Sequence, residues 1–114
     1  MRHSILASLF LTPVASAALA QNAAPALDAQ QTLGRQLLNQ HCAICHLKPQ
    51  LGATTYGPPL GVESLGGDEA AMRQVIGEGT QRMPGFKYKF DAAGIDAIVA
   101  YIKTVAAPPA PAKQ

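Results

Sequence analysis

Two cysteines and a histidine stand within five residues, in the segment Cys42-Ala43-Ile44-Cys45-His46. On a helical turn, side chains three and four positions apart leave the same face, so both thiols and the imidazole point in one direction. C-x-x-C-H is the attachment signature of c-type haem, in which two thiols bond to the vinyl groups and the histidine approaches the iron. The motif therefore predicts one covalently bound haem c, attached through Cys42 and Cys45, with His46 as an iron ligand.

Other uses of paired cysteines fit this sequence less well. A disulfide between Cys42 and Cys45 would close a very short loop and so restrict little chain entropy. A thioredoxin-like redox motif is expected beside a βαβ pattern, which the sequence lacks. A zinc site needs four ligands, and beyond residue 20 the thiol and imidazole donors are all crowded into residues 41–46.

Residues 1–20 have the layout of a secretory signal peptide, with a positive start, an apolar stretch and small residues at the end. Ala15-Ser16-Ala17 and Ala18-Leu19-Ala20 offer two A-x-A cleavage sites, of which the second is favoured. The apolar stretch is shorter than the roughly 20 residues that span a bilayer, and a proline interrupts it. We therefore expect a periplasmic protein with no membrane span after cleavage, and export agrees with haem attachment outside the cytoplasm.

The mature chain is expected to comprise a flexible linker (21–30), one domain (31–106) and a disordered tail rich in Pro and Ala (107–114). Apolar spacing predicts three helices in the domain: from about residue 31 into the cysteine motif, from about Asp68 to Gly79, and from Asp91 to about residue 105. Gly- and Pro-rich loops separate them without strand alternation, so the domain is predicted to be all-α. The expected apolar faces comprise Leu33, Leu37, Leu38 and Ile44 on the first helix, Ala71, Met72, Val75 and Ile76 on the second, and Ile95, Ile98, Val99, Ile102 and Val105 on the third.

Composition limits what the chain can bind and how it can fold. Nine Lys+Arg and seven Asp+Glu give a formal net charge of +2, and the cations are scattered rather than clustered as in a nucleic-acid-binding surface. Large side chains are few, with no Trp, three Phe and three Tyr. A domain this small has difficulty burying enough apolar surface. A buried macrocycle would supply the missing core volume.

The candidates for the second iron ligand can be reduced by elimination. His41 adjoins Cys42 and cannot reach the opposite face of the same haem. Met72 lies on the apolar face of a predicted helix, where core packing explains it. Met83 lies in a loop, and because Met/His ligation is the usual electron-transfer pairing, it is the predicted ligand. Two alternatives stay open: Met83 fills a gap beside an open or differently ligated haem, or Lys87 is the ligand.

With these features the chain resembles the class I monohaem c-type cytochromes over about residues 32–105. Gly34 stands where that family has a glycine packed against the last helix, and Tyr101 is the expected aromatic neighbour. The resemblance implies the cytochrome c fold, with three main helices and long loops wrapped around one covalently bound haem. Leu38 departs from the family pattern, in which an aromatic residue is common.

The segment Gly57-Pro58-Pro59-Leu60 is similar to the G-P-x-L motif of that family. The match implies that the Pro58 carbonyl accepts a hydrogen bond from His46 Nδ1–H, which would fix the ring tautomer and raise the basicity of the ligand. Four polar loop residues are candidate partners for the haem propionates: Tyr56, Arg82, Lys87 and Tyr88.

Two protein ligands would leave no open iron site, so the expected function is non-enzymatic: one-electron transfer in a periplasmic respiratory or dehydrogenase-linked chain. The expected partners of this monomer are redox proteins in transient complexes, with an exported dehydrogenase or membrane complex as donor and an oxidase or reductase as acceptor. No nucleic-acid partner is expected. One alternative is a haem c subunit permanently bound to a larger oxidoreductase, such as a quinoprotein dehydrogenase. A second alternative is a haem enzyme with an open iron site.

Overall fold

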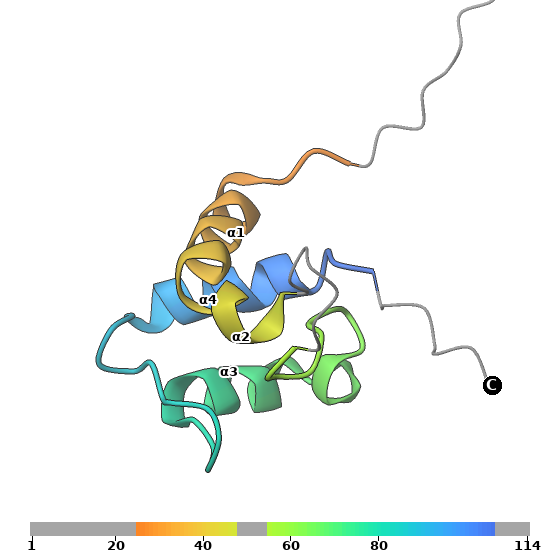
Figure 1. Cartoon of the computed structure of the whole chain (residues 1–114). Coiled ribbons are helices and arrows are strands. Elements are labelled where there is room, and N and C mark those ends of the chain that lie inside the picture. The colour runs from red at the N-terminus through yellow and green to blue at the C-terminus, as the bar shows by residue number, and fades with distance from the viewer. Residues whose placement is uncertain (1–24, 48–54, 107–114) are drawn as a thin grey trace, which may run out of the picture.

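The computed structural model describes residues 25–47 and 55–106. Within these ranges the chain forms four α-helices and a 3-10 helix and contains no strand (Figure 1). The helices are α1 (Ala29–His41), α2 (Ala43–His46), α3 (Glu69–Glu78) and α4 (Ala92–Ile102), and the 3-10 helix is Ser64–Gly67. The predicted all-α class is confirmed. The predicted signal peptide and tail, and residues 21–24 of the predicted linker, lie outside the described residues.

Aspartate side chains cap the three main helices. Asp68 accepts from the N–H groups of Ala70 and Ala71 at the start of α3, and Asp91 accepts from that of Gly94 at the start of α4. Helix α1 begins two residues before the expected residue 31, because Asp28 and Gln31 form a capping box. Gln31 N–H donates to Asp28 Oδ1 over 2.7 Å, and Asp28 N–H donates to Gln31 Oε1 over 3.1 Å.

Helices α1 and α4 cross in backbone contact at Gly34 (Figure 1). A Cβ placed on Gly34 would lie 1.8 Å from the carbonyl oxygen of Ala97 and 2.9 Å from Tyr101 Cβ. No side chain larger than hydrogen fits there without moving one helix. The predicted contact of Gly34 with the last helix and with Tyr101 is confirmed.

The core lies where α1, α3 and α4 meet. Its buried side chains are Leu38, Cys42, Met72, Ile76, Ile98, Val99 and Ile102. The apolar face predicted for the first helix is too broad, because Leu33 is 43% exposed and Ile44 is 91% exposed. Helix α1 ends at His41 and the chain turns at Cys42 into the separate helix α2, so Ile44 does not share the face of Leu38.

None of the helices in the described residues is long and apolar enough to cross a bilayer.

We expect Gly34→Ala to lower the free energy of unfolding by about 1–3 kcal/mol or more, the range of overpacked cores, because the added methyl meets backbone atoms. Gly77→Ala is the matched helical control. A Cβ on Gly77 would meet only Ile95 Cδ1, at an ordinary 3.8 Å, and Ala is favoured over Gly in a helix by roughly 0.5–1 kcal/mol. Denaturant unfolding of both variants measures the difference, and equal effects would contradict the backbone contact.

Candidate cofactor site

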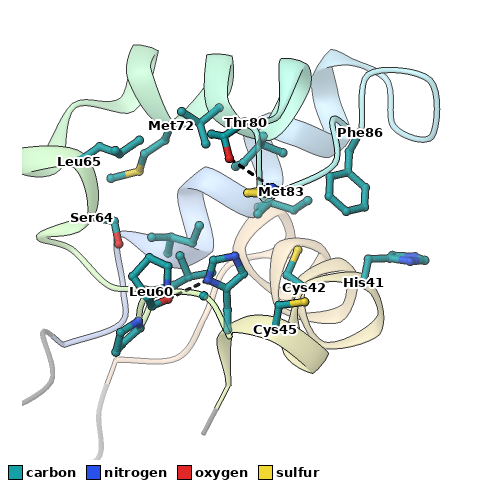
Figure 2. Close-up of a pocket in the computed structure, with 18 of the residues that line it drawn as sticks. His41, Cys42, Cys45, Leu60, Ser64, Leu65, Met72, Thr80, Met83 and Phe86 are labelled. Carbon is teal, nitrogen blue, oxygen red and sulfur yellow. Dashed lines mark hydrogen bonds between the residues drawn. The ribbon is translucent and has the colours of Figure 1, made fainter. Parts of the chain in front are cut away.

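A cavity of about 950 Å³ opens between the helices (Figure 2). This volume lies at the upper end of the roughly 300–1,000 Å³ typical of cofactor and small-molecule pockets. Residues from α2, α3, α4, the segment 56–65 and the loop 80–86 form its wall. Most of the lining side chains are apolar, among them Leu60, Met72, Val75, Ile76, Phe86, Ile98 and Ile102.

Both cysteines of the motif line this cavity and have free thiols. Cys42 ends α1, where its N–H donates to Leu38 O over 2.8 Å, and its own carbonyl accepts from Cys45 N–H over 3.1 Å. The two residues therefore occupy one tight turn. Cys42 is only 6% exposed. Burial raises the pKa of the Cys42 thiol above its ordinary value, and the charge of neighbouring Cys45 raises it further.

His46 is held in one orientation by the segment that follows it. Its Nδ1 donates to the Pro58 carbonyl over 2.7 Å. Because a carbonyl only accepts, Nδ1 carries a proton, and Nε2 is the ring nitrogen left to bind a metal. A Cβ on Gly57 would lie 2.7–2.8 Å from ring atoms Cε1 and Nδ1, and Gly57 N–H donates to Cys45 O over 2.8 Å. The glycine thus packs directly against the imidazole.

Met83 reaches the cavity from a different element, the loop after α3. Figure 2 shows it across the cavity from Cys42 and Cys45. Two backbone hydrogen bonds tie the end of this loop to α3: Phe86 N–H donates to Ile76 O over 2.9 Å, and Lys87 N–H donates to Gly77 O over 3.1 Å. The structure therefore brings Cys42, Cys45, His46, Pro58 and Met83 to one cavity.

The four candidate propionate partners separate into two pairs. Tyr56 and Arg82 line the cavity, and the Arg82 guanidinium carbon lies 4.8 Å from the centre of the Tyr56 ring. Lys87 and Tyr88 are not among the lining residues; Lys87 Nζ instead forms an ion pair with Glu78 over 2.7 Å and lies 5.3 Å from the Tyr88 ring centre. This placement favours Tyr56 and Arg82 and argues against Lys87 as an iron ligand.

Sequence reasoning missed other residues at the cavity. Met72, assigned only to the core, also lines the cavity. Leu65 lines it in the left-handed region, at φ 50°, which no pattern in the sequence indicates. Thr80 lines it as well. Its spacing from Met83, three residues within a short loop, is a signal that could have been read, since threonine hydroxyls often bond nearby backbone N–H groups.

Residues 29–102 match the family described as cytochrome C oxidase, cbb3-type, subunit III. The chain belongs to this family of c-type cytochromes.

The chain is similar to a small part of a longer protein and to nearly the whole of a short one. A dihydro-heme d1 dehydrogenase of Pseudomonas aeruginosa is 40% identical over an alignment of 78 residues that covers 66% of this chain and 15% of that protein. The solved structure of dihydro-heme d1 dehydrogenase NirN in complex with DHE superposes with a TM-score of 0.54 at 41% identity, covering 68% of this chain and 17% of the other. The c-type cytochrome SorU from Sinorhizobium meliloti superposes with a TM-score of 0.51 at 26% identity, covering 68% and 91% respectively.

The predicted class I monohaem cytochrome c fold is thereby confirmed, and the cofactor of the domain is haem c. The residues at the cavity fit this group. Two free thiols on one turn, an imidazole oriented through its Nδ1 hydrogen bond, and a thioether from another element all line a mainly apolar cavity. These are the donor types by which proteins hold a c-type haem.

We expect Gly57→Ala to displace the His46 ring and weaken its bond to Pro58. In the haem-loaded protein this should lower the unfolding free energy by about 1–3 kcal/mol. It should also speed exchange of the His46 Nδ1 proton with solvent roughly fivefold to tenfold, the effect of losing about 1 kcal/mol of hydrogen-bond energy. Proton NMR follows the exchange, and Gly77→Ala again serves as the control. Unchanged exchange in Gly57→Ala would show that the glycine does not fix the ring.

Proposed function

We propose that this chain is a periplasmic one-electron carrier in which Cys42 and Cys45 hold haem c through two thioether bonds, with His46 and Met83 as the iron ligands. The proposal is carried by one observation: Met83 faces the cysteine motif across the cavity, from a separate loop. When bound, the haem supplies an iron couple that takes up and releases one electron. Because the chain contributes both ligands, no iron site remains for a substrate, and we infer a carrier rather than an enzyme.

The residues around the cavity would adjust the potential of this couple in opposite directions. The Pro58 carbonyl, by accepting from His46 Nδ1–H, makes the imidazole a stronger donor, which favours oxidised iron. The thioether of Met83 favours reduced iron and raises the potential. The apolar wall excludes water, which also disfavours the more highly charged oxidised state. Two of these three effects favour reduced iron, so we infer a relatively high potential.

For such a carrier we propose export by residues 1–20 and transient electron exchange with other redox proteins. An exported dehydrogenase or a membrane complex would be the donor, and an oxidase or reductase the acceptor. The exposed fraction of Ile44, next to Cys45, is 91%. Ile44 also lines the cavity, so an exposed apolar side chain stands at its edge and supports close approach of a partner there.

A second candidate is a haem c subunit held permanently by a larger oxidoreductase. It is favoured by the match to a dehydrogenase in which the corresponding segment is 15% of the whole protein. Size-exclusion chromatography of a native periplasmic extract separates the two. Elution of the haem protein at the mass of a single mature chain supports the free carrier, whereas elution only in a stable larger assembly supports the subunit.

Met83→Ala should lower the midpoint potential by on the order of 0.1–0.2 V, because axial ligation moves haem potentials over a range of about 0.8 V. It should also allow rapid carbon monoxide binding to the reduced protein. Met72→Leu is the matched control, since it replaces the cavity's other methionine with a side chain of similar volume. Redox titration and carbon monoxide binding measure both effects. An unchanged potential in Met83→Ala would remove Met83 from the ligand set.

The covalent link is tested by mass spectrometry of the denatured protein. The wild-type chain should keep one haem after denaturation, each single variant, Cys42→Ser and Cys45→Ser, should keep it through one bond, and the double variant should lose it. Met83→Ala is the control and should retain the haem, because axial ligation does not contribute to the thioether bonds. Release of haem from the denatured wild-type chain would contradict the proposal.

A further inference from the structure

We propose that Thr80 is a positioning residue for Met83: its hydroxyl fixes the loop that presents the thioether to the cavity. This inference rests on the proposed role of Met83 as an iron ligand. It assigns to the loop a specific device that holds the ligand in place.

Thr80 and Met83 are joined by reciprocal hydrogen bonds. Thr80 N–H donates to Met83 O over 2.8 Å, and Met83 N–H donates to Thr80 Oγ1 over 3.2 Å. Arg82 N–H also donates to Thr80 Oγ1, over 3.3 Å. Figure 2 shows Thr80 and Met83 side by side at the cavity, with a dashed line between them. One hydroxyl therefore satisfies two backbone donors of the loop, one of them on the ligand residue itself.

Two glycines hold the same loop against the end of α3. Gly79 has φ 79°, and a Cβ on it would lie 2.5 Å from both Met83 O and Gly85 N. A Cβ on Gly85 would lie 2.6 Å from the carbonyl oxygens of Gly77 and Glu78. At both ends of the loop, therefore, two backbone segments are in direct contact. Between these ends, the Thr80 hydroxyl is the side-chain group bonded to the loop backbone.

The hydroxyl favours the closed loop because it accepts two hydrogen bonds there, from the N–H groups of Arg82 and Met83. Both bonds are exposed, so without the hydroxyl these N–H groups would bond to water in the closed and the open loop alike, and the closed loop would lose the net stabilisation of the two bonds. The equilibrium would shift toward opening, which takes the Met83 thioether away from the iron. Pro84 adds to this constraint, since it restricts Met83 to extended conformations and has no N–H of its own. The N–H groups of Arg82 and Met83 both have Thr80 Oγ1 as their acceptor within the loop.

Imidazole binding to the oxidised, haem-loaded protein measures this opening, because imidazole binds iron when Met83 leaves it. Thr80→Val keeps the shape of the side chain and removes the hydroxyl. It should tighten apparent imidazole affinity by about fivefold to thirtyfold, the effect of losing one to two hydrogen bonds. Thr80→Ser should stay near the wild-type affinity. Thr104→Val is the matched control, since it removes a threonine hydroxyl that donates to Tyr101 O over 2.7 Å at the end of α4.

The remaining variants separate failure of this inference from failure of the proposed ligand. Tighter imidazole binding in Met83→Ala together with an unchanged Thr80→Val would overturn the role of Thr80 alone. An unchanged Met83→Ala would overturn Met83 as ligand. A Thr80→Ser protein as altered as Thr80→Val, or a Thr104→Val protein as altered as either, would also overturn the role of the hydroxyl. Should Thr80→Val yield no haem-loaded protein, Gly85→Ala provides the second test: tighter binding supports a positioned loop, and unchanged binding contradicts it.

Discussion

The backbone contact of Gly34 with Ala97 fixes the separation of α1 and α4, and the position of the cysteine motif depends on it. Cys42 follows Gly34 by eight residues, a little over two helical turns, and ends α1. It is buried in the same cluster as Ile98 and Ile102, which also line the cavity. A larger residue at position 34 would tilt or lift α1, and the attachment turn would move with it. One close approach between helices thus determines where the haem-binding thiols are presented.

The histidine side and the methionine side of the cavity do not depend on close helix packing. Main-chain hydrogen bonds of irregular segments hold them in place. On the histidine side, Gly57 N–H donates to Cys45 O, and Val62 N–H donates to Val105 O over 2.9 Å, in the segment that follows α4. On the methionine side, the loop after α3 is bonded back to α3 itself. The backbone N–H and C=O groups of these segments are hydrogen-bonded to other backbone groups. The side chains that face the cavity can therefore be apolar. A site fixed before binding loses less conformational entropy when its cofactor binds.

The parts of this architecture that were predictable are those in which a local pattern has one physical meaning. The cysteine motif and the loop position of Met83 are of this kind, and so is the glycine of α1 once the family resemblance is added. The apolar face assigned to Leu33 and Ile44 was wrong because helical periodicity describes a face only while the helix continues, and the chain turns at Cys42. The left-handed backbone of Leu65 depends on local turn geometry, which has no period in the sequence. The bonds of Thr80 had only a weak local signal, its spacing of three residues from Met83.

Stability and redox behaviour are therefore expected to depend on different residues. The backbone contact of Gly34 lies between α1 and α4, whereas Met83 is only partly buried and packs against the core cluster from its edge. The loop of Thr80 and Met83 is half-buried or exposed and packs on α3 through glycines, so changes in it remove little core volume. Within one c-type domain, ligand geometry could then vary by loop substitutions at small cost to folding. Such independence suits a fold that recurs both as nearly a whole chain, in SorU, and as a small part of a dehydrogenase.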